Sequence, residues 1–306
     1  MKLQGITFIA TYRCNASCGH CFFGVSDSPY LAEHLIGRTF LEIGPLEWVH
    51  LSGGEPFLDP PELLSIISVI REHHPGHIGI ATNGYWARDT GETAKLVSSL
   101  ADQGVDGISF SVDVYHQRWV PLNRVITAAK AVRNAGMTNH SWIVASGDSA
   151  ESLELARQAS RESGLPLAEN AVRNIGKGAS RKGAGTGEIP QGLCRDLSCC
   201  LGETGPFDPK MLWIDPYGNV LICYGIIIGN VRDRSLNQIM EEYRPENNRV
   251  LSALAEEGPK GLYRLAEEKG CAPAGWFPDE CALCFRSRRE LRAYYPEILG
   301  PGECYP

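Results

Sequence analysis

The chain has no apolar run near the roughly 18 residues that a membrane-spanning helix needs, and its longest apolar stretch, 220–229, is interrupted by Cys, Tyr and Gly. The first residues lack the apolar segment of a signal peptide. The formal net charge is −7, and no basic cluster offsets it, which disfavours nucleic-acid binding. No internal repeat recurs at a fixed period. These absences predict a cytoplasmic globular protein without nucleic-acid or membrane partners.

Cysteine, in contrast, is abundant, with 11 among 306 residues. A reducing compartment disfavours structural disulfides, and the odd number argues against a complete disulfide set. The cysteines therefore indicate metal ligation or catalysis. Since 43% of the residues are hydrophobic and 21% are charged, the chain has the composition to bury a full core around such sites.

The first half alternates short β-rich runs with amphipathic helical patterns, which predicts parallel strands joined by helices. The predicted fold class is α/β, with six units that form either an incomplete barrel or a doubly wound sheet, and a partial (β/α)6 barrel is the expected form. Ligands bind at the carboxyl ends of the strands in such folds. The predicted strands are 6–10, 48–51, 78–82, 108–112, 142–145 and 170–175, and the predicted helices are 93–103, 123–134, 150–162, 236–242 and 250–269, with a further helix beginning after Asp59.

A glycine-rich stretch at 176–187 predicts a linker. We therefore expect two domains, the barrel over 1–190 and a small cysteine-rich domain over 191–306. Eight of the cysteines fall in the second part.

Cys14, Cys18 and Cys21 follow the first predicted strand directly. Three thiolates leave one iron of a [4Fe–4S] cube without a protein ligand, and a reactive metal centre needs such an open position. A structural zinc site normally has four protein ligands. The spacing therefore favours a catalytic iron–sulphur cluster.

This CxxxCxxC segment resembles the cluster-binding loop of the radical S-adenosylmethionine (radical SAM) superfamily. His20 occupies the position before the last cysteine, which is usually aromatic in that family. The resemblance implies that S-adenosylmethionine binds the open iron and is cleaved reductively to a 5′-deoxyadenosyl radical, which abstracts hydrogen from a substrate. It also implies a one-electron donor such as flavodoxin or ferredoxin.

Gly53, Gly54, Glu55 and Pro56 follow the second predicted strand and resemble the family's GGEP motif, which binds the amino group of the cofactor. Glycines permit close backbone approach, and a glutamate can pair with an ammonium group. A tight turn between strand and helix is the alternative interpretation.

Asn83 after the third strand, and Ser111 and Asp113 at the end of the fourth, resemble the positions that contact the cofactor's carboxylate and ribose. Asn-Gly and Ser/Asp endings also form ordinary turns. The motif usual on the fifth strand is indistinct in 141–145, so adenine contacts stay unassigned.

The run 211–223 predicts a hairpin that turns at 215–219. Cys281 and Cys284 open an arginine-rich helix, whose dipole and arginines (Arg286, Arg288 and Arg289) favour thiolates. This part resembles the SPASM/Twitch region that holds auxiliary clusters, but 285–295 lacks the further cysteines of a complete SPASM pattern. The resemblance therefore implies one auxiliary [4Fe–4S] cluster, and a zinc site is the alternative. The implied ligands are Cys200, Cys223, Cys281 and Cys284, with Cys194 or Cys199 as alternates to Cys200.

Four further residues are candidates for catalysis. Cys271 and Cys304 are either inert buried thiols or hydrogen donors. His116 is a general acid or base, or a loop histidine bonded to backbone. Arg173 binds a substrate carboxylate or phosphate, or lies on a solvated turn.

The resemblance implies hydrogen abstraction from a peptide or small-molecule substrate, with oxidation, cross-linking or epimerisation as the outcome. The chain begins at its first strand, without an N-terminal peptide-recognition domain, which lowers the expectation of a peptide. A small-molecule dehydrogenase of the same superfamily is the alternative, and a non-enzymatic zinc protein is the hypothesis from another class.

Overall fold

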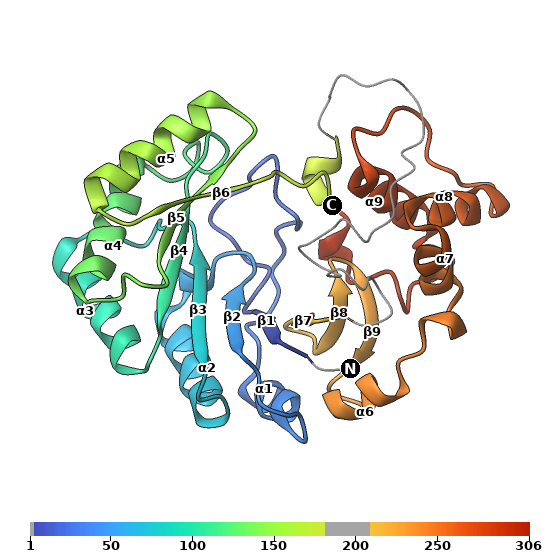
Figure 1. The fold of residues 1–306 in the computed structure, drawn as a ribbon, viewed down its shortest axis with the longest axis horizontal. Helices are drawn as coiled ribbons and strands as arrows, with labels where there is room; N and C mark the ends of the chain where they lie inside the picture. Colours follow the sequence, from blue (N-terminus) through green and yellow to red (C-terminus); the bar gives the residue numbers. More distant parts are fainter. Residues whose placement is uncertain (1–2, 181–208) are drawn as a thin grey trace.

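One mixed sheet of nine strands organises the computed structural model, which describes residues 3–180 and 209–306 (Figure 1). The strands lie in the order β6-β5-β4-β3-β2-β1-β7-β8-β9, and β1 to β6 pair in parallel. The predicted α/β class with six barrel units is confirmed. The parallel strands are β1 (Gly5–Ile9), β2 (Trp48–Ser52), β3 (His77–Thr82), β4 (Gly107–Ser111), β5 (Trp142–Ser146) and β6 (Leu167–Asn170).

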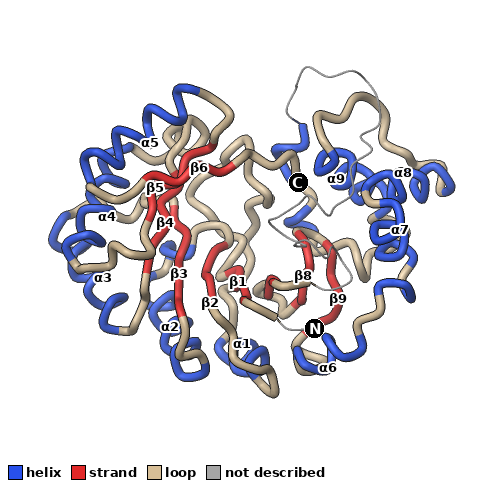
Figure 2. Tube along the Cα trace, in the orientation of Figure 1, coloured by secondary structure: helices blue, strands red, loops and turns tan. Residues whose placement is uncertain are grey.

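Five helices connect these strands and cover the outer face of the sheet (Figure 2). Asp59 caps the second of them through its side chain, as predicted. Alternate strand residues such as Ile6, Phe8 and Leu51 are fully buried beneath the helices, whereas the opposite face of the strands lines cavities. The helices are α1 (Glu33–Phe40), α2 (Pro60–His73), α3 (Thr90–Asp102), α4 (Leu122–Asn134) and α5 (Ala150–Ser163).

The sixth strand begins earlier than predicted, at Leu167 rather than near Asn170. It is the edge strand of the sheet, and three of its four residues are exposed. An edge strand needs no apolar run, so the apolar residues after Asn170 were a misleading signal.

The sheet continues across the predicted boundary at residue 190, because β7 (Met211–Ile214) pairs in parallel with β1. The predicted hairpin is confirmed, and β8 (Asn219–Cys223) pairs antiparallel with β7 and with β9 (Ile226–Asn230). Four helices follow, and α7 to α9 form a group beyond β9 (Figure 2). They are α6 (Leu236–Glu242), α7 (Arg249–Glu257), α8 (Pro259–Glu268) and α9 (Glu280–Leu291).

The single helix predicted over 250–269 is wrong, since α7 and α8 are separate helices. Gly258 lies between them with a φ of +64°, a backbone conformation that favours glycine. Pro259 follows and disfavours a helical conformation at the residue before it. Within the described residues, no helix combines the length and apolarity that crossing a membrane requires.

The C-terminus returns to the centre of the molecule (Figure 1). The backbone carbonyl of Glu303 accepts a hydrogen bond from the Gly24 amide at 2.6 Å, and its carboxylate accepts one from the Tyr217 hydroxyl at 2.7 Å. The last residues therefore join the loop after β1 to the turn between β7 and β8.

Capping of α3 provides a test of local stability. The Asp89 carboxylate accepts a hydrogen bond from the Glu92 amide at 2.9 Å. We expect Asp89→Ala to lower the free energy of unfolding by about 1 kcal/mol, because a helical amide loses its partner. Asp102→Ala, at the opposite end of the same helix, is the matched control and is expected to be neutral or slightly stabilising. Urea unfolding measures both, and equal effects would contradict the capping role.

Candidate active site

The three cysteines of the first cluster lie in the loop after β1 and line one cavity of about 260 Å³. All three are free thiols. Burial raises the pKa of Cys14 to about 12, and burial also raises the pKa of Cys21. Such thiols ionise when a cation compensates the charge, as metal ligands do on binding. The donor set therefore suits a metal centre with an open side facing the cavity.

The same cavity receives the carboxyl ends of the parallel strands, as expected for this fold class. Gly53 and Gly54 come from the loop after β2, Asn83 from the loop after β3, and Ser111 and Asp113 from β4 and its end. The structure thus brings the predicted motif residues to the predicted cysteines. Further lining residues that carry polar side chains are His20, Ser52, Thr82, His116, Ser146, Asn170, Arg173 and Tyr224.

The two glycines are required by close packing of backbone. A Cβ on Gly54 would lie 1.9 Å from the Arg13 carbonyl oxygen, and a Cβ on Gly53 would lie 2.5 Å from the Thr11 carbonyl oxygen. The Gly54 amide donates to that Thr11 carbonyl at 2.7 Å. The loop after β2 therefore supports the chain immediately before Cys14.

Glu55 is fully buried and does not line the cavity. Its carboxylate accepts hydrogen bonds from the Thr82 hydroxyl at 2.7 Å and from the amides of Asn83 and Phe57 at 2.8 and 3.1 Å. Burial raises the pKa of Glu55 to about 7, although these hydrogen bonds oppose the shift. Glu55 thus holds the loop that carries Asn83, and Pro56 begins a short 3₁₀ turn (Pro56–Leu58) behind it.

Asp113 holds two histidines at the cavity wall. Its Oδ2 lies 2.9 Å from Nδ1 of His116 and 3.4 Å from Nε2 of His20. Burial opposes ionisation of Asp113, but these histidines outweigh it and hold the pKa well below its usual range. Burial also opposes the charged form of His116 and lowers its pKa, but hydrogen bonds to Asp113 and Cys18 outweigh burial and raise that pKa to about 10. His116 is therefore a cation beside a predicted ligand, and Tyr115 stacks on His20 with centroids 4.4 Å apart.

Part of the second cysteine set also comes together. Cys223 ends β8, and Cys281 and Cys284 lie in the first turns of α9, which Asp279 caps. Burial raises the pKa of Cys281, and the neighbouring Cys284 and Cys223 raise it further. Cys200 and its alternates, Cys194 and Cys199, lie outside the described residues.

Neither Cys271 nor Cys304 lines the cavity. Cys304 is buried with its sulfur 3.8 Å from the Tyr12 hydroxyl, which lies 3.3 Å from Asp215. Cys271 follows α8 and is partly buried against the core. Arg173, by contrast, does line the cavity and lies close enough to Cys281 to lower its pKa.

Among the cavity residues that sequence reasoning missed are three with polar side chains. Ser146 ends β5 and lies one residue beyond the predicted strand 142–145. Asn170 ends β6, but the prediction had it begin the sixth strand. Tyr224, directly after Cys223, reaches the cavity from the C-terminal part and stacks near Phe22 with ring centroids 4.6 Å apart. Of these three, only Ser146 could have been found from the sequence, because a polar residue directly after an apolar strand is expected at the carboxyl end of the sheet.

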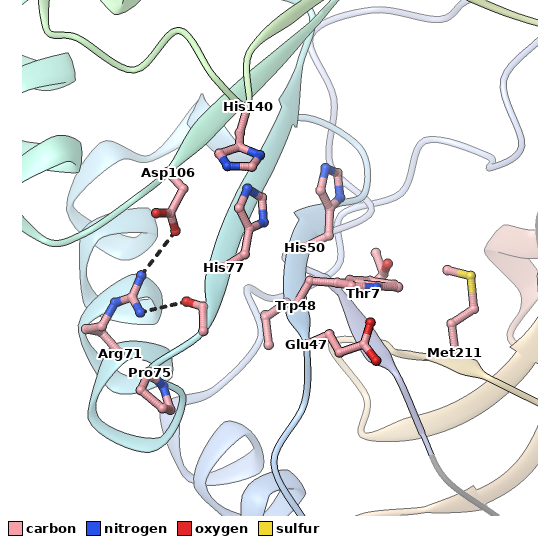
Figure 3. A pocket seen from close by; sticks show the side chains of 12 residues that line it. Thr7, Glu47, Trp48, His50, Arg71, Pro75, His77, Asp106, His140 and Met211 are labelled. Carbon is pink, nitrogen blue, oxygen red and sulfur yellow. Dashed lines mark hydrogen bonds and ion pairs between the residues drawn. The ribbon is translucent and has the colours of Figure 1, made fainter.

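A second cavity, of about 850 Å³, lies at the amino ends of the strands (Figure 3). His50, His77 and His140 line it together with Trp48, and it shares no lining residue with the cysteine cavity. Burial lowers the pKa of His50 to about 4 and also lowers that of His77, so these imidazoles are neutral. None of the predicted site residues lies there.

Comparisons with known proteins agree with this geometry. Residues 8–158 match the family described as "Radical SAM superfamily". "Putative peptide biosynthesis protein YydG" of Bacillus subtilis (strain 168) is 27% identical over 120 residues, which are 37% of this chain and 37% of that protein. The alignment thus spans little more than a third of that relative.

Two solved structures share the fold. SuiB of Streptococcus suis bound to precursor peptide SuiA has a TM-score of 0.60 at 16% identity, covering 92% of this chain and 76% of that chain. anSMEcpe with bound AdoMet and Cp18Cys peptide has a TM-score of 0.59 at 15% identity, covering 97% and 98%. At these identities the likeness establishes the fold alone.

The buried carboxyl of Glu55 predicts a pH effect on stability. Because its pKa rises from 4.5 to about 7 on folding, the folded state holds the extra proton in this window. The contribution of Glu55 to the free energy of unfolding therefore falls as the pH rises through the window. We expect Glu55→Gln to lack this component, as measured by urea unfolding of the apoprotein at several pH values. The exposed Glu62→Gln is the control, and an unchanged pH profile in Glu55→Gln would contradict the burial argument.

Proposed function

Residues 8–158 form a radical SAM domain, so this chain is an enzyme of the radical SAM superfamily, and from that premise we propose that it oxidises a peptide substrate with the help of an auxiliary [4Fe–4S] cluster. The convergence on one cavity of three free thiols after β1 and of the carboxyl ends of β2 to β6 carries the proposal. Membership of this family excludes the non-enzymatic zinc protein.

Cys14, Cys18 and Cys21 are the proposed ligands of the catalytic cluster. When bound, the cluster and S-adenosylmethionine supply a 5′-deoxyadenosyl radical, and a one-electron donor such as flavodoxin or ferredoxin supplies the electron. The three thiols, of which Cys18 is buried and the other two are partly buried, fit this requirement, and Asn83 Nδ2 lies 3.9 Å from the Cys14 sulfur.

The proposed cofactor contacts are divided between cavity walls and their supports. Glu55 acts beneath the wall by holding Asn83, whereas Asp113 lines the cavity and also orients His20 and His116. His116 then serves as a charge beside Cys18 rather than as a proton donor to substrate. The residues proposed to face the cofactor are His20, Gly53, Gly54, Asn83, Ser111 and Asp113, with Glu55 and Pro56 behind them.

The auxiliary cluster is proposed to lie in the C-terminal part, 191–306, with Cys223, Cys281 and Cys284 as ligands and Cys200 as the fourth. The proximity of the three described thiols supports this assignment. Tyr224 lines the cavity and directly follows Cys223, so a cluster bound to Cys223 would accept an electron close to a substrate in the cavity.

A peptide is the proposed substrate class. Two of the solved structures that cover most of this chain were determined with a peptide bound, and the Bacillus relative is named for peptide biosynthesis. Arg173 at the cavity wall provides a cation for a peptide carboxylate. A small-molecule dehydrogenase would use the same residues on a different substrate.

Oxidation is favoured over epimerisation because Cys271 and Cys304 lie away from the cavity. Neither thiol is placed to return hydrogen to a substrate radical. The substrate instead loses a hydrogen atom, then an electron to the auxiliary cluster and a proton to water, and ends two hydrogens lighter. Intramolecular cross-linking gives the same balance.

Removal of a ligand tests the catalytic cluster. We expect Cys18→Ala to abolish formation of 5′-deoxyadenosine from S-adenosylmethionine after anaerobic reconstitution, because the cluster loses one of three protein ligands. Cys271→Ala, which changes a thiol outside the cavity, is the matched control and is expected to retain cleavage. Chromatography with mass detection measures the product, and cleavage by the Cys18→Ala variant would refute the assignment.

The reaction class is tested on peptides encoded by short reading frames beside the gene. Incubation in deuterium oxide is expected to yield a product lighter by two hydrogens without deuterium at the modified residue. A product of unchanged composition that has gained deuterium would identify an epimerase and overturn the proposed oxidation. If S-adenosylmethionine is cleaved but every peptide is returned unmodified, a peptide substrate is contradicted and the small-molecule alternative is supported.

A further inference from the structure

Arg288 in α9 is a guanidinium buried inside the protein, with 1% of the residue exposed. The other two arginines of this helix turn away from the cysteines. Arg286 donates to the backbone carbonyls of Trp276 and Ala274, and the partly exposed Arg289 pairs with Glu290. Of the three arginines that the sequence placed near the thiols, Arg288 is the one that points inward.

The surroundings of Arg288 contain sulfur and oxygen acceptors, and no carboxylate among the described residues is paired with it. Nη1 donates to the Tyr224 carbonyl and lies 3.5 Å from the Tyr305 hydroxyl. The guanidinium also hydrogen bonds to the thiol of Cys284, and Cys223 lies near enough to influence it. Nε is buried and has no partner among the described residues.

This arrangement is costly without a compensating negative charge. An arginine cannot shed its proton in a protein, and a buried unpaired ion costs several kcal/mol. The side chains nearest to it are two thiols and a phenol, and none of the described ones is a carboxylate. A cluster held by four thiolates carries a net negative charge, and reduction adds one more. The buried cation therefore matches the group that the neighbouring thiols are proposed to hold.

We propose that Arg288 is the internal counter-charge of the auxiliary cluster and raises its reduction potential. The inference rests on the proposed function, because it needs the auxiliary cluster. Hydrogen bonds to ligand sulfurs and nearby positive charge both favour the reduced state of iron–sulphur centres. Arg288 also donates to the backbone of Tyr224 at the cavity wall, so it lies between the cluster and the substrate position. Its role is positioning and electrostatic tuning, without contact to substrate.

The potential of the auxiliary cluster tests the inference in the full chain. In a Cys14→Ala, Cys18→Ala, Cys21→Ala background, the auxiliary cluster is isolated for a redox titration followed by electron paramagnetic resonance. We expect Arg288→Gln to make reduction at least tenfold less favourable, a shift of about 59 mV to lower potential for one electron. Arg288→Lys keeps the charge and is expected to shift less, and Arg289→Gln is the surface control with no shift. An unchanged potential in Arg288→Gln would overturn the inference.

Thermal unfolding of the apo and reconstituted proteins separates this role from a purely structural one. Without the cluster, Arg288 is an uncompensated buried charge, so Arg288→Gln is expected to leave the apoprotein as stable or more stable. With the cluster, the same substitution is expected to lower the melting temperature. Equal losses in both forms would identify a structural arginine and overturn the inference, and this comparison decides the matter if Arg288→Gln fails to retain iron.

Iron and sulphide counts distinguish failure of the inference from failure of the proposed function. A triple-cysteine background that retains roughly four irons per chain supports the auxiliary cluster. A triple-cysteine background that retains no iron refutes both the proposed auxiliary cluster and the inference about Arg288. If iron is retained but Arg288→Gln leaves the reduction potential unchanged, the role of Arg288 is refuted and the auxiliary cluster still stands.

Discussion

The position of β1 between β2 and β7 is the constraint on which the rest of this structure depends. Ile9 is in register with Ser52 on one side, and Phe8 is in register with Ile214 on the other. Parallel strands in register end at the same edge of the sheet. The cysteine loop, the glycine loop and the turn at Asp215 therefore leave the sheet together, although they lie far apart in the chain.

Buried charge is the second organising feature. Glu55 and Asp113 are almost fully enclosed, and Glu55 accepts hydrogen bonds from the end of β3 whereas Asp113 accepts them from its own loop. Such networks stabilise only when every member has a partner. Arg288 differs because no carboxylate is among its described partners, which points to a charged group that the polypeptide itself does not contain.

An aromatic contact connects the two sets of cysteines. Phe22 follows Cys21 and Tyr224 follows Cys223, and their rings pack with centroids 4.6 Å apart. Phe23 and Trp213 also pack against Tyr224. The two proposed cluster sites are thus linked by a rigid apolar wall that also lines the cavity, so a substrate bound there contacts both halves of the chain.

The sequence by itself determined the strand order in the chain, the α/β class and the motif loops, because hydrophobic period and cysteine spacing act over a few residues. Such local signals fail at the start of β6 and at the break near Gly258. The position of β6 at the edge of the sheet removed the need for an apolar run, and Pro259 disfavoured a helical conformation at the residue before it. Only the tertiary structure decided that Glu55 lies beneath the cavity, that Cys271 and Cys304 lie away from it, and that Arg288 turns inward. The physical reason is that burial and charge pairing depend on residues brought together from distant parts of the chain, which spacing along the sequence does not encode.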